Sequence, residues 1–270
     1  MMELLRALLY TCSSFPKICA PHRLSLSDEF ERCMVTGFAA LEPSKRVAEG
    51  VERVERGEID LGSLGLGKAM AEALSRSAHE LGHRMVVEIA LAMPVASALS
   101  KLMDGGRALG DAMNALRRAA MLSTTEDALC VVDALRRLGG EYALIVERAD
   151  LSDRRILVEN MKLLDVVNQL SNHSRAMSQL FSSSDAVAML SAAREGIKKG
   201  VSVVHALSRA FVSRALEELG ISERIDDMHT ARGLARIAKL DRELRGRGVR
   251  MTHLLIPLLY ASIQLVKEGL

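Results

Sequence analysis

The chain has 270 residues, of which 49% are hydrophobic and 26% charged, so it has enough apolar material to bury one large core. Its 36 Lys and Arg residues against 34 Asp and Glu leave a formal charge of +2, which favours neither nucleic acid nor an acidic membrane surface as a partner. Aromatic residues make up only 3% and Trp is absent, so few rings are available for stacking on bases, and nucleic-acid binding is disfavoured.

The first expected element is a helix over residues 1–12, whose Glu3 and Arg6 argue against a secretory signal. Further along the chain, apolar residues recur at helical spacing in several stretches. The clearest are Ala128, Val131, Val132, Leu135 and Leu138; Leu163, Leu164, Val167 and Leu170; and Val204, Leu207, Phe211, Ala215 and Leu219. The sequence therefore predicts an all-α protein.

Start and stop signals divide these helices. Ser123-x-x-Glu126 is a capping box, and Gly139-Gly140 is typical of a helix end. The one strand-like run, residues 142–146, has no partner strand with which to form a sheet. We expect a single compact bundle of about ten helices, forming one domain over residues 1–270.

Two apolar stretches and the cysteines bear on location. Residues 89–100 and 251–266 lack formal charge but are shorter than the roughly 20 residues of a membrane span, so we expect buried core helices in a cytoplasmic protein. The four cysteines show no C-x-x-C spacing and lie among apolar neighbours, and we expect all of them to be reduced thiols packed as small hydrophobic side chains. They are Cys12, Cys19, Cys33 and Cys130.

The segment Pro16–Arg23 is the first candidate for chemistry. Its two prolines predict a non-helical loop after the first helix. On this loop Lys17, His22 and Arg23 bring together a point charge, a proton carrier and a planar guanidinium, which are groups suited to phosphate. A solvated basic loop is the alternative interpretation.

Two later motifs resemble known ligand sites. Residues 62–69 (GSLGLGKA) approach a phosphate-binding P-loop, but no strand is expected before them, so we interpret them as a glycine-rich helix start. His79-Glu80-Leu81-Gly82-His83 matches H-E-x-x-H, in which two histidines on one helical face hold zinc and the glutamate acts as general base. A third ligand with diagnostic spacing is missing, and two partly exposed histidines near a helix end are the alternative.

Several segments, in consistent order over roughly residues 5–268, resemble the triphosphoribosyl-dephospho-CoA synthase family, especially its archaeal-type members. The matching segments are Pro16-Lys17 with His22-Arg23; Ser123-Thr124-Thr125-Glu126-Asp127-Ala128 with Gly139-Gly140; Leu163–Val166; and Leu240–Leu244. Two family motifs differ. His83, Arg84 and Met85 stand in place of Asn-Thr-His, and an apolar helix replaces the C-terminal Asn-Pro-Gly-Thr-Thr-Ala-Asp-Leu around residues 249–257.

The resemblance implies a reaction. Members of this family join ATP to 3′-dephospho-CoA and release adenine, a glycosyl transfer that forms a prosthetic-group precursor; such a transfer benefits from an acid, a base and Mg²⁺ on the triphosphate. Carried onto this chain, the resemblance implies a set of site residues. They are Lys17, Arg23 and Arg84 for phosphate, His22, His83 and Glu80 for catalysis, and Asp127 or Glu126 for Mg²⁺.

Three functions follow from these patterns. The first is a transferase of this type, with nucleotide substrates such as ATP and dephospho-CoA, with no nucleic-acid or membrane partner, and with a homodimer as a candidate assembly. The second is an inactive helical binding or scaffold protein, because the apolar Met85, Val86 and Val87 replace polar motif residues. The third is a zinc hydrolase using His79, Glu80 and His83. The first requires the Lys17–Arg23 loop and the His79–His83 turn to face one another across a cleft, with Lys17, His22 and Arg23 lining the same cavity as His83.

Overall fold

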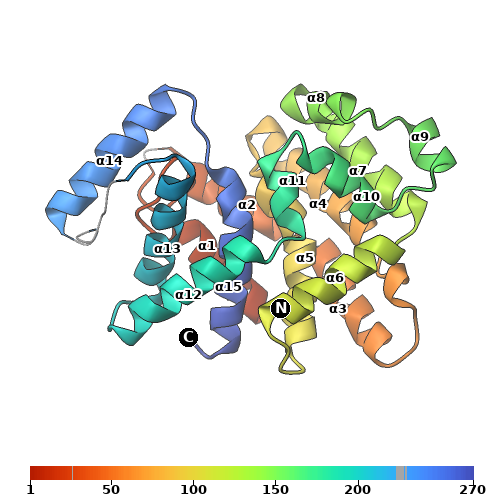
Figure 1. Cartoon of the computed structure of the whole chain (residues 1–270), viewed down its shortest axis with the longest axis horizontal. Coiled ribbons are helices and arrows are strands. Elements are labelled where there is room, and N and C mark those ends of the chain that lie inside the picture. Colours follow the sequence, from red (N-terminus) through yellow and green to blue (C-terminus); the bar gives the residue numbers. More distant parts are fainter. Residues whose placement is uncertain (26, 223–227, 229) are drawn as a thin grey trace.

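The computed structural model describes residues 1–25, 27–222, 228 and 230–270. Within them the chain forms helices and no strand, so the predicted all-α class is confirmed (Figure 1). The α-helices are α1 Met2–Ser13, α2 Glu29–Ala39, α3 Leu41–Glu55, α4 Leu66–Leu81, α5 Val87–Met103, α6 Leu109–Leu122, α7 Thr125–Leu138, α8 Gly140–Arg148, α9 Asp153–Val158, α10 Leu163–Ser171, α11 Arg175–Leu180, α12 Ser184–Lys198, α13 Val203–Glu218, α14 Ala231–Gly246 and α15 Leu255–Lys267. Short 3₁₀ turns η1, η2 and η3 cover Leu61–Ser63, Gly82–Arg84 and Thr252–Leu254.

The described residues contain fifteen α-helices, more than the roughly ten expected. Part of the excess comes from α9 and α11, which have six residues each and are too short to show a periodic apolar stripe. Local caps start both: the Ser152 and Ser174 hydroxyls accept hydrogen bonds from the backbone amides three residues later. The strand-like run 142–146 lies in α8, because tertiary packing outweighs the β-propensity of a short segment.

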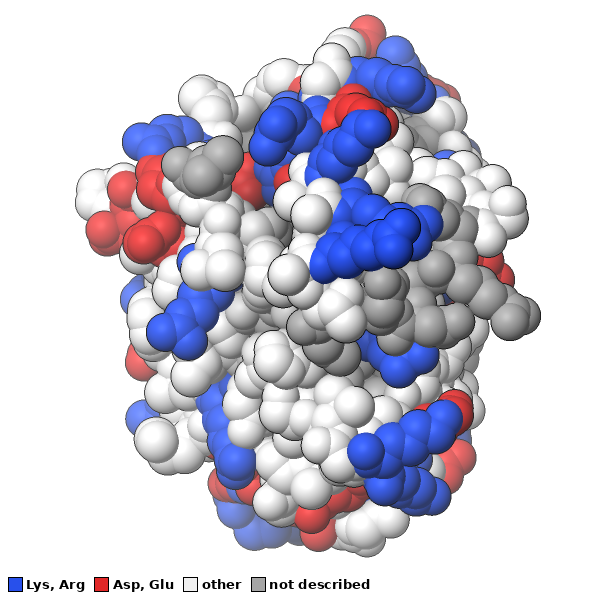
Figure 2. All heavy atoms as spheres, turned by 90° about the vertical axis from the view of Figure 1, so that its left-hand side faces the viewer, with Lys and Arg blue, Asp and Glu red and all other residues white. Residues whose placement is uncertain are grey.

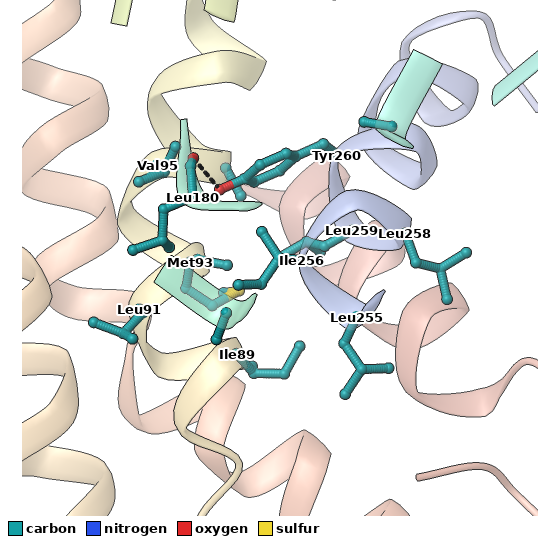
Figure 3. Close-up of a cluster of buried hydrophobic side chains, with 14 of the residues drawn as sticks. Ile89, Leu91, Met93, Val95, Leu180, Leu255, Ile256, Leu258, Leu259 and Tyr260 are labelled. Atoms are coloured by element: carbon teal, nitrogen blue, oxygen red, sulfur yellow. Dashed lines mark hydrogen bonds between the residues drawn. The ribbon is translucent and has the colours of Figure 1, made fainter. Parts of the chain in front are cut away.

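The centre of the molecule is built from α5 and α15, which contain most of the two stretches without formal charge, 89–100 and 251–266. Almost every side chain of these two helices is buried, including those of Ile89, Met93, Ile256 and Tyr260 (Figure 3). The Tyr260 hydroxyl donates a hydrogen bond of 2.9 Å to the Leu180 carbonyl, so this polar group is satisfied in the apolar interior. As expected, both stretches are core helices; among the described residues no helix has the length and apolarity that a membrane crossing requires.

Helices α4 and α7 meet through a glycine of the P-loop-like segment. A side chain at Gly67 would place its Cβ 2.2 Å from the Asp127 carbonyl oxygen, so only glycine permits this approach. The helix begins at Leu66, after Gly65 in the left-handed conformation. The expected glycine-rich helix start is confirmed, and the motif's spacing serves helix packing.

The cysteine prediction was wrong for one pair. Cys12, near the end of α1, and Cys33, in α2, form a disulfide with their Cα atoms 5.9 Å apart. Both side chains are fully buried, whereas Cys19 and Cys130 are free thiols. The sequence gives no spacing signal for this bond, because the fold brings α1 and α2 together.

Helix α14 lies at the left-hand edge of Figure 1, and Figure 2 shows the molecule from that side. Basic and acidic side chains are spread over this face among uncharged residues. From α14, Asp241 accepts a hydrogen bond of 2.5 Å from the Cys19 backbone amide, and the Arg245 guanidinium donates to the Ala20 carbonyl at 3.0 Å. The two side chains fix the Pro16–Arg23 loop against α14 and so position one wall of the site described next.

Candidate functional site

The structure contains a cleft of about 740 Å³, which is lined by residues from the N-terminal, middle and C-terminal parts of the chain. This volume is within the range of roughly 300–1,000 Å³ that is usual for small-molecule sites. The walls come from the loop 19–21, the start of α2, the turn and helix start at 83–88, the α7–α8 junction, the start of α11 and the segment 245–253. Five arginines are among the described lining residues: Arg32, Arg84, Arg175, Arg245 and Arg250.

Three helices of eight residues or more, α2, α5 and α8, begin at this cleft. The start of a helix carries a partial positive charge and unpaired backbone amides, and a carboxylate in the first turn stabilises it. Each of these helices has such a residue lining the cleft, namely Glu29, Glu88 and Glu141. The cleft thus combines guanidinium groups with the positive ends of helices, and the three glutamates partly balance that charge.

Glycines make the third of these helix starts possible. Gly139 and Gly140 both adopt positive φ, 70° and 54°, a conformation that is costly for other residues. They end α7 and start α8 without an intervening loop, which leaves the first turn of α8 facing the cleft. The Gly-Gly pair that resembles the family motif therefore lies at the candidate site.

Ion pairs hold most of the cleft's charged groups. The Arg245 guanidinium donates to Glu29 at 2.6 Å and to both carboxylate oxygens of Asp241 at 2.9 Å. Burial acts to lower the pKa of Arg245, but these carboxylates raise it. At the rim, Arg250 lies 3.7 Å from Glu141, and Arg84 forms an ion pair with Asp28. The arginines are thus held at the cleft before any ligand arrives.

Glu88 is in a different environment. Its side chain lines the cleft but is only 9% exposed, and its carboxylate accepts a hydrogen bond from the Thr252 hydroxyl. Burial raises the pKa of Glu88, while the hydrogen bond from Thr252 lowers it. Tyr142 lies in the same wall, and burial together with the Glu88 and Glu141 charges raises the pKa of its phenol. The raised pKa keeps the Tyr142 phenol protonated at neutral pH.

Three histidines also line the cleft: His83, His173 and His253. The His253 Nε2 lies 2.9 Å from a carboxylate oxygen of Glu218, which also pairs with Arg175. Such a carboxylate fixes the orientation of the imidazole ring. His83, a predicted catalytic residue, is exposed and therefore accessible to a ligand.

The predicted loop and turn do meet at one cleft, but none of the three loop side chains expected there, Lys17, His22 and Arg23, lines it. Cys19, Ala20 and Pro21 line it together with His83 and Arg84. Lys17 is only 1% exposed, and its ammonium donates to the backbone carbonyls of Thr11 and Pro21 at 2.5 and 2.7 Å. Arg23 is exposed and is not among the lining residues. In this arrangement the loop contributes backbone to the cleft, and Lys17 supports the loop from behind.

His22 also lies behind the loop. Its ring is 7% exposed and packs against Phe15 at a centroid distance of 5.0 Å, and its Nδ1 has no hydrogen-bond partner among the described residues. Burial, followed by the nearby Lys17 charge, lowers the pKa of His22 to about 4. At neutral pH the ring is therefore an uncharged core group rather than a phosphate ligand.

His22 should make the protein less stable in mild acid. Between pH 6.5 and 4 the unfolded chain binds a proton at His22 that the folded chain excludes, so stability falls as the pH falls through this window. We expect wild type to lose about 2 kcal/mol more than His22→Phe between pH 7 and pH 4 in urea unfolding, after allowance for partial solvent screening. Equal losses in both proteins would contradict the assignment.

The H-E-x-x-H residues do not share one face. Helix α4 ends at Leu81, and Gly82, with φ of 57°, turns the chain before His83. His79 and Glu80 line a second groove of about 870 Å³ beside Phe38, whereas His83 lines the arginine-lined cleft. In the described parts of the chain, no group of three His, Cys, Asp or Glu side chains is placed to hold a metal. This geometry does not fit a zinc ion shared by His79 and His83.

Asp127 and Glu126, which were expected to support Mg²⁺, instead contact Lys68 at the start of α4. The Asp127 carboxylate accepts a hydrogen bond of 2.9 Å from the Lys68 backbone amide, and Glu126 pairs with the Lys68 ammonium at 2.9 Å. Burial is the main cause that raises the pKa of Asp127. Neither residue lines the cleft, so they do not fit a Mg²⁺ ion at this site. Their carboxylates join α7 to α4.

Sequence reasoning missed most of the cleft's charged side chains. The sequence patterns assigned none of Glu88, Tyr142, Thr252 and His253 to a site. The missed arginines lie on separate elements, so no local spacing connects them. The available signal was the acidic residue in the first turn of each helix, which marks helix starts but does not reveal that three of them converge.

Comparisons of the chain with protein-family models, with curated proteins and with solved structures gave no match.

Proposed function

We propose that this protein is a transferase that binds a nucleoside triphosphate in the arginine-lined cleft and passes its triphosphoribosyl group to a hydroxyl acceptor of the dephospho-CoA type. One observation carries the proposal: residues Cys19–Pro21 of the Pro16–Arg23 loop and the His83–Arg84 turn, which stands in place of the family's Asn-Thr-His motif, line one cleft with five arginines. Guanidinium groups bind phosphate oxygens with two parallel hydrogen bonds, so this set favours a polyphosphate over a singly charged ligand.

The rim arginines are suited to receive the phosphates. The side chains of Arg84 and Arg175 are 64% and 67% exposed, and each pairs with one carboxylate, of Asp28 and Glu218 respectively. Exposed ion pairs contribute little to stability, so exchanging a carboxylate for a phosphate costs little. Arg245 is more buried and is engaged on three sides, and it positions the loop rather than the ligand.

The reaction needs proton transfer at two positions. The acceptor oxygen forms a bond to the ribose C1′ while the bond from C1′ to the adenine nitrogen breaks; the acceptor loses a proton and adenine gains one. His83 and His173 line the cleft, and an imidazole side chain can act as a proton donor or acceptor there. We derive no step through Mg²⁺, because the carboxylates expected to support it lie elsewhere.

A binding protein without turnover is the second candidate, and one wall of the cleft favours it. Met85, Val86, Val87 and Ile145 make this wall apolar, where the family's motif is polar. Such a wall holds an apolar part of a ligand but performs no chemistry. Binding and turnover must therefore be measured separately.

The first test measures binding of Mg-ATP to the protein by calorimetry and by thermal shift. Arg84→Gln should weaken ATP binding roughly tenfold or more, because a charge-assisted bond to phosphate is lost. Arg46→Gln is the matched control: Arg46 is also an exposed arginine paired with a carboxylate, Glu72, but it lies on α3 away from the cleft. Wild type without saturable Mg-ATP binding would refute the proposal.

Turnover is tested by chromatographic detection of free adenine from ATP and dephospho-CoA. Release that requires both substrates and falls in Arg84→Gln supports the transferase. Binding of Mg-ATP without any adenine release supports the binding protein instead.

A further inference from the structure

Glu88 differs from the other two glutamates of the cleft in its partners. Glu29 pairs with Arg245 and Glu141 with Arg250, so both carboxylates are neutralised by guanidinium groups. Glu88 forms no ion pair with any residue that the structure describes. Its contacts are the Thr252 hydroxyl and its own backbone amide, and these leave carboxylate lone pairs open.

A carboxylate in this position is costly unless further donors reach it. Its side chain is 9% exposed, so solvent reaches it only through the cleft that it lines. A buried carboxylate is stabilised most by hydrogen bonds that it accepts from N–H or O–H groups. A phosphate offers no such donor at neutral pH, and its negative charge repels the carboxylate. The arginine rim and the Glu88 wall therefore favour different parts of a ligand.

Tyr142 gives this wall a second recognition element. Its ring is largely buried and lies in the first turn of α8. Among the described residues that line the cleft, Tyr142 is the only Phe, Tyr or Trp. An aromatic face receives a flat heterocycle by stacking. The apolar Val87 and Ile145 in the same cleft suit a base or sugar and not a charged group.

We infer that Glu88, Thr252 and Tyr142 form a nucleoside subsite, in which the Glu88 carboxylate accepts a hydrogen bond from an amino or hydroxyl group of the ligand while the arginines hold its phosphates. The inference rests on the proposed function and specifies which end of the ligand lies where. According to this inference, Glu88 makes the protein select a nucleotide over a bare polyphosphate.

The experiment compares two probes, ATP and inorganic tripolyphosphate, both with Mg²⁺, by calorimetry at pH 7.5. Wild type should bind both, with ATP tighter. Glu88→Ala should weaken ATP binding roughly tenfold, while tripolyphosphate binding stays equal or becomes tighter because a negative charge is removed. Glu88→Gln keeps the shape and an acceptor oxygen, so it should show a smaller loss of ATP binding; it also serves if the alanine variant folds poorly.

Glu141→Ala is the matched control. Glu141 also lies in a first turn and lines the cleft, but it is exposed and paired with Arg250. Its loss should change the affinities for ATP and tripolyphosphate by the same factor. The inference is overturned if Glu88→Ala shifts both ligands equally or shifts neither, and in that case the proposed function still stands on wild-type binding. Wild type that binds neither probe overturns both.

Discussion

Replacing Lys17 with methionine is expected to lower the free energy of unfolding by about 3 kcal/mol. The Lys17 ammonium donates to the carbonyls of Thr11, Pro21 and Cys12 at 2.5, 2.7 and 3.4 Å, and burial holds its pKa well below the usual value. Methionine fills similar space but cannot donate a hydrogen bond to these buried carbonyls. Two-state urea denaturation measures the difference.

Arg23→Met is the control for Lys17, because Arg23 is an exposed cation of the same loop. Its effect on stability should stay within about 0.5 kcal/mol. The pair also separates two roles for Lys17. If Lys17→Met keeps wild-type stability but loses Mg-ATP binding, the lysine contacts the ligand and the structural role described above is wrong.

The double variant Cys12→Ala, Cys33→Ala removes the disulfide. We expect its free energy of unfolding to be lower than that of wild type by about 3 kcal/mol, similar to the effect of Lys17→Met. The bond closes a loop between residues 21 positions apart and so restricts the unfolded chain. It also fixes the end of α1 to the helix that carries Glu29 and Arg32 into the cleft. Denaturation without reductant measures the loss.

Thiol counting provides the direct check on this bond. Denatured, unreduced protein should expose two reactive thiols, those of Cys19 and Cys130, and four after reduction. Cys19→Ala, which removes a buried free thiol, should cost clearly less than the double variant. Four reactive thiols before reduction would show that the disulfide is absent.

The expected residues reached the candidate site only in part, and the reason differs for each. His83 and Arg84 line the cleft because Gly82 turns the chain after α4, whereas His79 and Glu80 remain on the helix and face another groove. Lys17 belongs to a predicted basic loop, but the carbonyls at the end of α1 bind its ammonium. Sequence spacing identifies which residue types are near one another, and not the direction in which a loop side chain points.

The sequence alone determined the helical class, the buried nature of the two uncharged stretches and the helix start within residues 62–69, because apolar periodicity and glycine-rich helix boundaries are local signals. Only the tertiary structure decided which helix starts converge, that arginines of separate elements share a cleft, and that Glu88 lines it without an ion pair. These features depend on contacts between residues far apart in the chain. Local propensities carry no information about such contacts, since packing of the whole core fixes them.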